Sequence, residues 1–334
     1  MIRNLKYAGL FAASVALLCT ATAWAAPRSA SAWLSYMQHA LSSASYSGVL
    51  VFMGRGQPVT YQLVVSKGTY ARMTALTGPT REIIRGPHAV LRLRPNGQMM
   101  VVRGMGGGAS PLPFPPATRV KRSVLEKSYR LKLGGTDRVA GEAAQLMQIV
   151  PRDHWRYGYR VWIGRHTGLP LRSELVTSDG HPLQQAFFTH LQLIKAPAAM
   201  SAIGAREMTI LAHASVQETT HSGGCTDEGQ AAFTFKKLPP GFHVLKTVCE
   251  QAPNGGLPVT HMLIGDGLAT VSLFVTVHHQ GRPALVGRTT IGAVHAVGRV
   301  EGSYALTAMG DAPIATVARI ARALSVEKQQ KSGN

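Results

Sequence analysis

The sequence predicts a β-rich α+β protein with two domains behind an N-terminal export signal. Removing the signal leaves about 309 residues, which exceeds the roughly 100–200 residues of one domain. Apolar residues alternate along many short runs, and Asn-Gly and Asp-Gly pairs separate some of them, which is typical of antiparallel strands joined by hairpins. Helical spacing is clear in only two segments, 31–41 and 314–324. A sheet with so many strands must curl, and a helix can then cover its inner face.

The N-terminus has the three parts of a secretory signal. Arg3 and Lys6 supply positive charge, an apolar run follows from Tyr7 to Thr20, and small residues then flank a predicted cut after Ala25. The alternative is an uncleaved membrane anchor, but the run is shorter than the roughly 20 residues that a spanning helix needs. We therefore predict a signal peptide at 1–25 and a mature protein outside the cytoplasm.

The chain is strongly basic, with 35 Lys and Arg residues against 16 Asp and Glu and a formal charge of +19. Loss of Arg3 and Lys6 with the signal leaves about +17. Such an excess favours acidic proteins, phosphorylated lipids or anionic membrane surfaces as partners. Export argues against nucleic acid. Because the basic residues are scattered along the chain, the alternative that they serve solubility alone stays open.

Two cysteines remain after the signal, Cys225 and Cys249. An even pair in an oxidising compartment predicts a disulfide bond. Its loop of about two dozen residues would add roughly 3 kcal/mol of stability. A pair of free thiols is an alternative. A zinc site with His221 as third ligand is another, although the paired ligand spacing of such sites is missing.

The first domain is predicted at 26–196, with an amphipathic helix at 31–41 followed by strands. The expected strands lie at 49–52, 59–65, 89–94, 99–102, 129–133, 144–150, 157–163, 171–177 and 183–193. Asn96-Gly97 and Asp179-Gly180 provide two of the turns. The segment 103–116 is rich in Gly and Pro and predicts a surface loop. It lacks the strand–GxxxxGK[ST]–helix context of a phosphate loop.

Residues 197–230 are small, polar and irregular, and they predict an interdomain linker with one added strand near 208–211. The second domain is predicted at 231–326, with a disordered tail at 327–334. Its expected strands lie at 232–236, 259–264, 270–278, 289–297 and 303–309, before a helix that starts near Pro313. Two domains joined in this way usually move relative to each other.

Several strings, in a fixed order, resemble the RseB/MucB family of periplasmic regulators of an envelope-stress sigma factor. The resemblance covers nearly the whole mature chain. The strings are Tyr46-Ser47-Gly48, Gly78-Pro79-Thr80-Arg81-Glu82, Arg138-Val139-Ala140-Gly141, Pro151-Arg152-Asp153, Arg156-Tyr157-Gly158-Tyr159-Arg160-Val161-Trp162, Thr167-Gly168-Leu169-Pro170, Leu238-Pro239-Pro240-Gly241-Phe242 and Asp266-Gly267-Leu268-Ala269.

The resemblance implies a first domain like the lipoprotein carriers, an open curved antiparallel half-barrel covered by helices, and a smaller C-terminal α+β domain. It implies a partner, the periplasmic part of a membrane-spanning anti-sigma factor, which the protein would shield from proteolysis. Lipopolysaccharide or mislocalised lipoproteins would release it. The C-terminal domain would contribute to the contact, with Asp266, Gly267, Leu268 and Ala269 as candidates; a turn opening a strand is the alternative. Family members often carry acids where this chain has Ala71, Thr77 and Gly164.

A curled sheet with one apolar face under a helix could hold acyl chains. Alternation along 157–163 places Tyr157, Tyr159, Val161 and Ile163 on one face and Arg156, Arg160 and Trp162 on the other. An ordinary filled core is the alternative for each residue. The candidate lining residues are Trp33, Met37, Leu91, Leu93, Tyr157, Tyr159, Val161 and Ile163.

Catalysis is not expected. His278 and His279 are adjacent in a strand and point to opposite faces, and no Ser or Cys stands in a recognisable nucleophile motif. We expect no cofactor and no metal, and a homo-oligomer remains open. The competing hypotheses are a lipid or lipoprotein carrier without a regulatory role, which would not need a second domain, and an envelope hydrolase.

Overall fold

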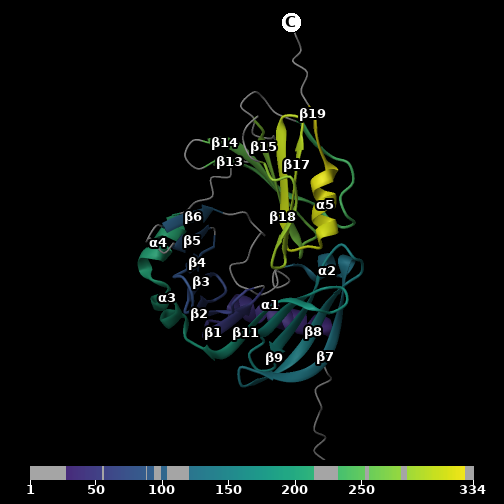
Figure 1. Ribbon diagram of the computed structural model, residues 1–334. Helices are drawn as coiled ribbons and strands as arrows, with labels where there is room; N and C mark the ends of the chain where they lie inside the picture. The colour runs from purple at the N-terminus through teal and green to yellow at the C-terminus, as the bar shows by residue number, and fades with distance from the viewer. Residues whose placement is uncertain are drawn as a thin grey trace, which may run out of the picture.

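A computed structural model describes residues 28–54, 56–87, 89–93, 99–103, 120–213, 232–252, 256–279 and 284–327. The predicted signal peptide, nearly all of the Gly- and Pro-rich loop, and Cys225 lie outside these ranges. Within them the chain forms a large curved sheet with helices, followed by a smaller sheet with one helix (Figure 1). The α+β, β-rich class predicted from the sequence is confirmed.

The first domain contains one antiparallel sheet of eleven strands in the order β6-β5-β4-β3-β2-β1-β11-β10-β9-β8-β7. In the described part of the chain no pairing joins β6 to β7, so the sheet curls without closing. Its strands are β1 (Tyr46–Met53), β2 (Val59–Ser66), β3 (Tyr70–Ala75), β4 (Glu82–Arg85), β5 (Ala89–Leu93), β6 (Met99–Arg103), β7 (Tyr129–Val139), β8 (Glu142–Pro151), β9 (Gly158–Gly164), β10 (Pro170–Val176) and β11 (Pro182–Leu193).

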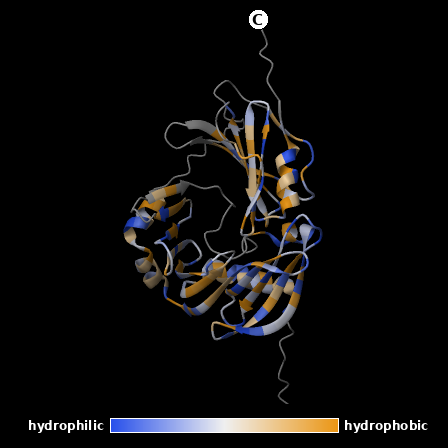
Figure 2. Cartoon of the chain, viewed as in Figure 1, coloured by the Kyte–Doolittle hydropathy of each residue, from blue (hydrophilic) through white to orange (hydrophobic). Residues whose placement is uncertain are grey.

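The strands predicted from period-two alternation are confirmed, and apolar and polar residues alternate along them in Figure 2. The pairing of β5 with β6 matches the predicted Asn-Gly hairpin, although the turn itself lies outside the described residues. The Asp179-Gly180 hairpin joins β10 to β11, and Gly180 takes a φ of +88°, which favours glycine. Strands β3 and β4 were not predicted, nor was helix α2 (Arg122–Ser128).

Helix α1 (Ala30–Ser43) lies inside the curve of the sheet, as its apolar stripe predicted (Figure 1). The Ser29 side chain accepts a hydrogen bond from the Ala32 amide at 3.2 Å and so caps the first turn. The helix buries Trp33, Leu34 and Met37 against the sheet. Helix α1 thus covers the inner face of the sheet over β8 and β9.

The prediction that 197–230 is an irregular linker is wrong over its first part. The chain forms α3 (Ala196–Ile203) and α4 (Ala205–His213), so residues 208–211 are helical and not a strand. Gly204, with a φ of +98°, separates the two helices. Ile203 and Leu211 are fully buried against the outer face of β2, β4 and β5, because they lie on the apolar sides of the helices.

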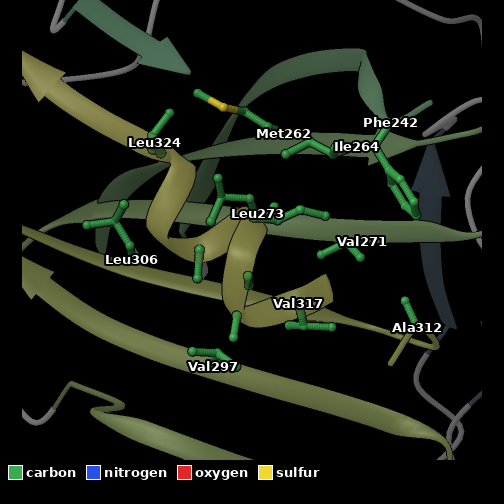
Figure 3. Packing of buried hydrophobic residues seen from close by; sticks show 14 of the residues in the cluster. Phe242, Met262, Ile264, Val271, Leu273, Val297, Leu306, Ala312, Val317 and Leu324 are labelled. Carbon is green, nitrogen blue, oxygen red and sulfur yellow. The ribbon is translucent and has the colours of Figure 1, made fainter. Parts of the chain in front are cut away.

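The second domain contains a six-stranded antiparallel sheet in the order β13-β14-β15-β18-β17-β16 and a two-stranded ribbon. Helix α5 (Ile314–Ala323) packs on the sheet through Val317 and its neighbours (Figure 3). The strands are β12 (Ala232–Phe235), β13 (His243–Ala252), β14 (Gly256–Gly265), β15 (Thr270–Val277), β16 (Gly287–Ile291), β17 (Val294–Glu301), β18 (Tyr304–Gly310) and β19 (Leu324–Glu327).

Three details of the second domain differ from the prediction. The run at 289–297 is two strands, because Gly292 turns the chain with a φ of +65°. Strand β13 was not predicted. Glu327, predicted as the first residue of the tail, belongs to β19 and pairs with β12, and the rest of the predicted tail lies outside the described residues.

Candidate functional site

Most of the predicted lipid-lining residues lie together under α1, on the inner face of the sheet. Tyr159, Val161 and Ile163 project from β9, while Trp33 and Met37 project from the helix. Each is at most 8% exposed, and all five belong to one packed cluster. In this structure they therefore behave as core residues, which is the alternative that the sequence left open.

Leu91 and Leu93 do not belong to that group. The pairing of β5 with β4 places Leu91 opposite Ile84 and Leu93 opposite Glu82, on the outer face of the sheet. There Leu91 is fully buried and Leu93 partly buried beneath α3 and α4. Placing them with Trp33 was wrong, because the face of a residue in β5 depends on its pairing through β4 and β3, two strands that the alternation did not reveal.

Tyr157 precedes β9 and contacts the second domain. Its hydroxyl lies 3.0 Å from Nε2 of His295, whose Nδ1 lies 2.8 Å from the Thr290 hydroxyl. Burial raises the pKa of Tyr157, and the negative charge of Asp311 raises it further. Tyr157 thus contacts the second domain through its hydroxyl, while its side chain packs, partly buried, against the cluster under α1.

The inner face has a second region, over β1 to β4, that the sequence analysis did not identify. Phe52, Tyr61 and Ile83 are only partly buried there and surround the fully buried Leu50 and Leu63. Pairing places the exposed Arg92 directly opposite Ile83 on the same face. This region combines accessible apolar surface with a cation, which is the chemistry that an acyl chain with an anionic headgroup requires. Alternation in β2 was the available signal, since Tyr61 and Leu63 share one face.

Asp266 to Ala269, the candidate anti-sigma contact, form a buried turn at the junction of the two domains. Oδ1 of Asp266 accepts hydrogen bonds from the Leu268 amide at 2.9 Å and the Ala269 amide at 2.8 Å. Leu268 packs in the cluster under α1. Gly267, with a φ of +100°, has only 3.0 Å between the place of a Cβ and a methyl group of Val124 in α2. Except for Gly267 the segment is buried: Asp266 and Leu268 contact the first domain, and Ala269 packs in the core of the second.

Arg156, from the loop between β8 and β9, is the main polar link across this junction. Its side chain is 2% exposed. Nε lies 2.9 Å from Oδ2 of Asp266, Nη2 donates to the carbonyl oxygen of Pro240 at 2.5 Å, and Nη1 donates to Asp153 of its own domain at 2.9 Å. Its guanidinium also lies 5.3 Å from the ring centroid of Phe242. Arg156 therefore contacts two separate loops of the second domain.

Trp155 adds a second link beside it. Its carbonyl oxygen accepts a hydrogen bond from the Thr316 hydroxyl at 2.7 Å, and the guanidinium of Arg319 lies 5.1 Å from the ring centroid. Both partners belong to α5.

Arg160 and Trp162 lie on the face of β9 that points away from α1. Arg172 lies 4.5 Å from the ring centroid of Trp162, and both Arg160 and Arg172 pair with Glu174. The two sides of β9 differ in character as the alternation predicted for Arg160 and Trp162, whereas placing Arg156 with them was wrong, because Arg156 lies in the loop before the strand and contacts the second domain.

Burial shifts the pKa of three more groups near the junction, Tyr129, Tyr159 and Asp311. It raises the pKa of Tyr129 and Tyr159 well above the ordinary value, and nearby acids raise both further. It also raises the pKa of the Asp311 carboxyl. No cluster of His, Cys, Asp and Glu suited to a metal ion is present among the described residues.

The cysteine prediction is only partly open to inspection. Cys249 takes part in a disulfide bond. Cys225 and His221 lie outside the described ranges, so the pairing with Cys225 stays a prediction. In the part of the chain that the structure describes, none of the helices has the length and hydrophobicity needed to cross a membrane.

Two family models match the chain. The MucB/RseB N-terminal domain matches residues 29–209, and the MucB/RseB C-terminal domain matches residues 227–325. Among curated proteins, the chain is 28% identical over 309 residues to the sigma factor AlgU regulatory protein MucB of Pseudomonas aeruginosa, covering 89% of this chain and 91% of that protein. It is 28% identical over 320 residues to the sigma-E factor regulatory protein RseB of Haemophilus influenzae, covering 95% and 96%.

Solved structures give the same result. The crystal structure of MucB in complex with MucA(peri) matches with a TM-score of 0.65 at 26% identity, over 90% of this chain and 100% of that one. A crystal structure of MucB matches with a TM-score of 0.61 at 26% identity, over 89% and 98%. The similarity thus covers both domains.

Proposed function

The chain belongs to the MucB/RseB family, and on that premise we propose that it negatively regulates an envelope-stress sigma factor by binding the periplasmic domain of a membrane-spanning anti-sigma factor. The bound anti-sigma factor is shielded from regulated proteolysis, so the sigma factor stays inactive. The observation that carries this proposal is the similarity, over both domains, to a MucB structure determined with MucA(peri). The curated relatives are named as regulatory proteins, which supports a binding role without catalysis.

The protein acts in the periplasm after cleavage of its signal peptide following Ala25. An exported, strongly basic chain is suited to an acidic partner or to anionic lipid, since its charge attracts both before contact. The disulfide bond of Cys249 also fits an oxidising compartment.

Lipid release is the second part of the proposal. Lipopolysaccharide or the acyl chains of mislocalised lipoproteins bind the inner face of the sheet over β1 to β4, where Phe52, Tyr61 and Ile83 are only partly buried. The residues under α1 support this less well, because they already pack against the helix. If bound lipid weakens the affinity for the anti-sigma factor, then the bound anti-sigma factor must weaken the affinity for lipid by the same factor.

The test is calorimetric titration of the mature protein with the periplasmic domain of the anti-sigma factor encoded by the same organism. We expect binding with a dissociation constant between nanomolar and micromolar, and weaker binding after saturation with lipopolysaccharide. A Tyr61→Asp variant should lose the lipid effect while keeping the binding, whereas Tyr304→Asp in the second domain serves as control. Absence of binding would refute the regulatory role, and transfer of lipoprotein between membranes would then favour a carrier.

A further inference from the structure

Arg156 and Asp266 form a buried ion pair between the two domains, and we propose that this pair acts as a latch. Arg156 is a positioning residue: with Asp266 it fixes the orientation of the domains, and thereby the combined surface that both present to the anti-sigma factor. The inference rests on the proposed function for its consequence, but the latch itself is a property of the free protein.

The two charges are nearly inaccessible to water, with side-chain exposures of 2% and 0%. Burying an ion pair contributes little net stability, because the loss of hydration offsets most of the attraction. Breaking it while the domains stay together is costly, since the remaining charge is then buried without its partner. The state that relieves this cost is the one in which the domains separate and water reaches both groups.

Each partner keeps local interactions after separation. Arg156 retains Asp153, which lies three residues before it in the same domain at 2.9 Å. Asp266 retains its two backbone amides through Oδ1. Among the described residues, the polar contacts that Arg156 would lose on separation are the ion pair with Oδ2 of Asp266 and the hydrogen bond to the Pro240 carbonyl. Opening the latch also exposes apolar surface, because Leu268 packs in the cluster under α1 and Trp155 packs against the core of the second domain.

The loops that receive Arg156 are shaped for close approach. Gly241 has a φ of +79°, and a Cβ there would lie 3.3 Å from Nη2 of Arg156 and 3.0 Å from Oγ of Ser128. Gly267 similarly approaches Val124. Two further polar links described across the junction are the hydrogen bond from the Thr316 hydroxyl to the Trp155 carbonyl and the contact between the Tyr157 hydroxyl and His295. Among the described residues the ion pair joins two full charges across this junction, although Nε and Oδ2 do not form an aligned hydrogen bond; the directional bond of Arg156 is the one from Nη2 to the Pro240 carbonyl.

The test compares Arg156→Gln, Asp266→Asn and the double variant with Arg160→Gln. Arg160 is a matched control because it also pairs with an acid, Glu174, but at 3.5 Å and within one sheet. Small-angle X-ray scattering of each mature protein measures the domain arrangement, far-UV circular dichroism checks the fold, and calorimetry measures anti-sigma binding.

We expect both single variants to keep their circular dichroism spectrum, to show a larger radius of gyration than wild type, and to bind the anti-sigma domain at least ten-fold more weakly. The double variant should be no worse than either single variant, because both remove the same interaction. Arg160→Gln should match wild type in all three measurements.

Scattering profiles of Arg156→Gln and Asp266→Asn that match the Arg160→Gln control would overturn the latch. If Arg156→Gln fails to fold, Asp266→Asn decides the question, since asparagine has nearly the volume of aspartate but no charge. If wild type does not bind the anti-sigma domain, the proposed function is wrong. The scattering profiles then decide by themselves whether the ion pair fixes the orientation of the domains. Normal binding by variants with separated domains would overturn the positioning role.

Discussion

Replacement of Met37 by alanine tests whether α1 packs directly on the curved sheet. Met37 is fully buried, at 0% exposure, among the residues of β8 and β9. Truncating such a side chain removes its transfer free energy and leaves a cavity, at a cost of about 2–5 kcal/mol. For a domain of roughly 150–250 residues each kcal/mol lowers the melting temperature by about 2–4 °C. We therefore expect the first domain to melt about 4–20 °C earlier.

Differential scanning calorimetry of the mature protein measures this loss, with Met53→Ala as the control. Met53 lies at the end of β1 and is 38% exposed, so its truncation should change stability by no more than about 0.5 kcal/mol. Equal melting temperatures for the two variants would refute the reasoning. In that case α1 would not fill the inner face at this point, and the residues beneath it would be available for acyl chains.

Three further predictions concern other parts of the fold. Gly267→Ala should lower the free energy of unfolding by about 2–4 kcal/mol, because backbone strain of about 1–3 kcal/mol at positive φ adds to a clash with α2. Gly302→Ala is the control, because its surroundings are open and it should suffer backbone strain alone. Urea denaturation measures the free energy of unfolding of both variants. Burial raises the pKa of the Asp311 carboxyl in the folded protein above its ordinary value of 3.8. The folded protein is therefore more stable at acid pH, where Asp311 is neutral, and it loses this stability as the pH rises through the pKa of the folded state. Asp311→Asn should remove that loss, and melting temperatures at about pH 4 and pH 8 should then differ less than in wild type. Leu211→Ala should cost about 2–5 kcal/mol in thermal unfolding because α4 is part of the first domain, whereas Leu193→Ala, 58% exposed, should cost little.

The sequence revealed the strands of the curved sheet because alternation needs only local information. Tyr159, Val161 and Ile163 do share one face, and Trp162 points to the other, as counting by two required. The same counting could not place Leu91, because its face depends on how many strands separate it from β9 and on each register between them. Strands β3 and β4 carry weak alternation, and without them the two ends of the sheet could not be related.

The helices after β11 were missed for a different reason. Alanine, serine and glycine dominate the segment around Ala199, and such a composition resembles a linker until the few apolar residues are seen to repeat at helical spacing. Ala199 and Ile203 are four residues apart in α3, and Met208 and Leu211 are three apart in α4; their packing against the outer face of the sheet stabilises the helices.

The role of Arg156 could not be seen from the sequence. A basic residue in a loop is usually exposed, and its acidic partner, Asp266, lies in another domain. The family strings contained both residues, but similarity gave them different roles, one in a strand motif and the other in a partner contact. Only the fold brings them within 2.9 Å.

Protection of the anti-sigma factor from cleavage can be measured directly. The most direct measurement is the rate at which the regulatory protease cuts the periplasmic domain of the anti-sigma factor, with and without a stoichiometric amount of the mature protein. We expect the rate to fall at least ten-fold and to recover when lipopolysaccharide is added. An unchanged rate, under conditions where the protease cleaves the free substrate fully, would contradict the account.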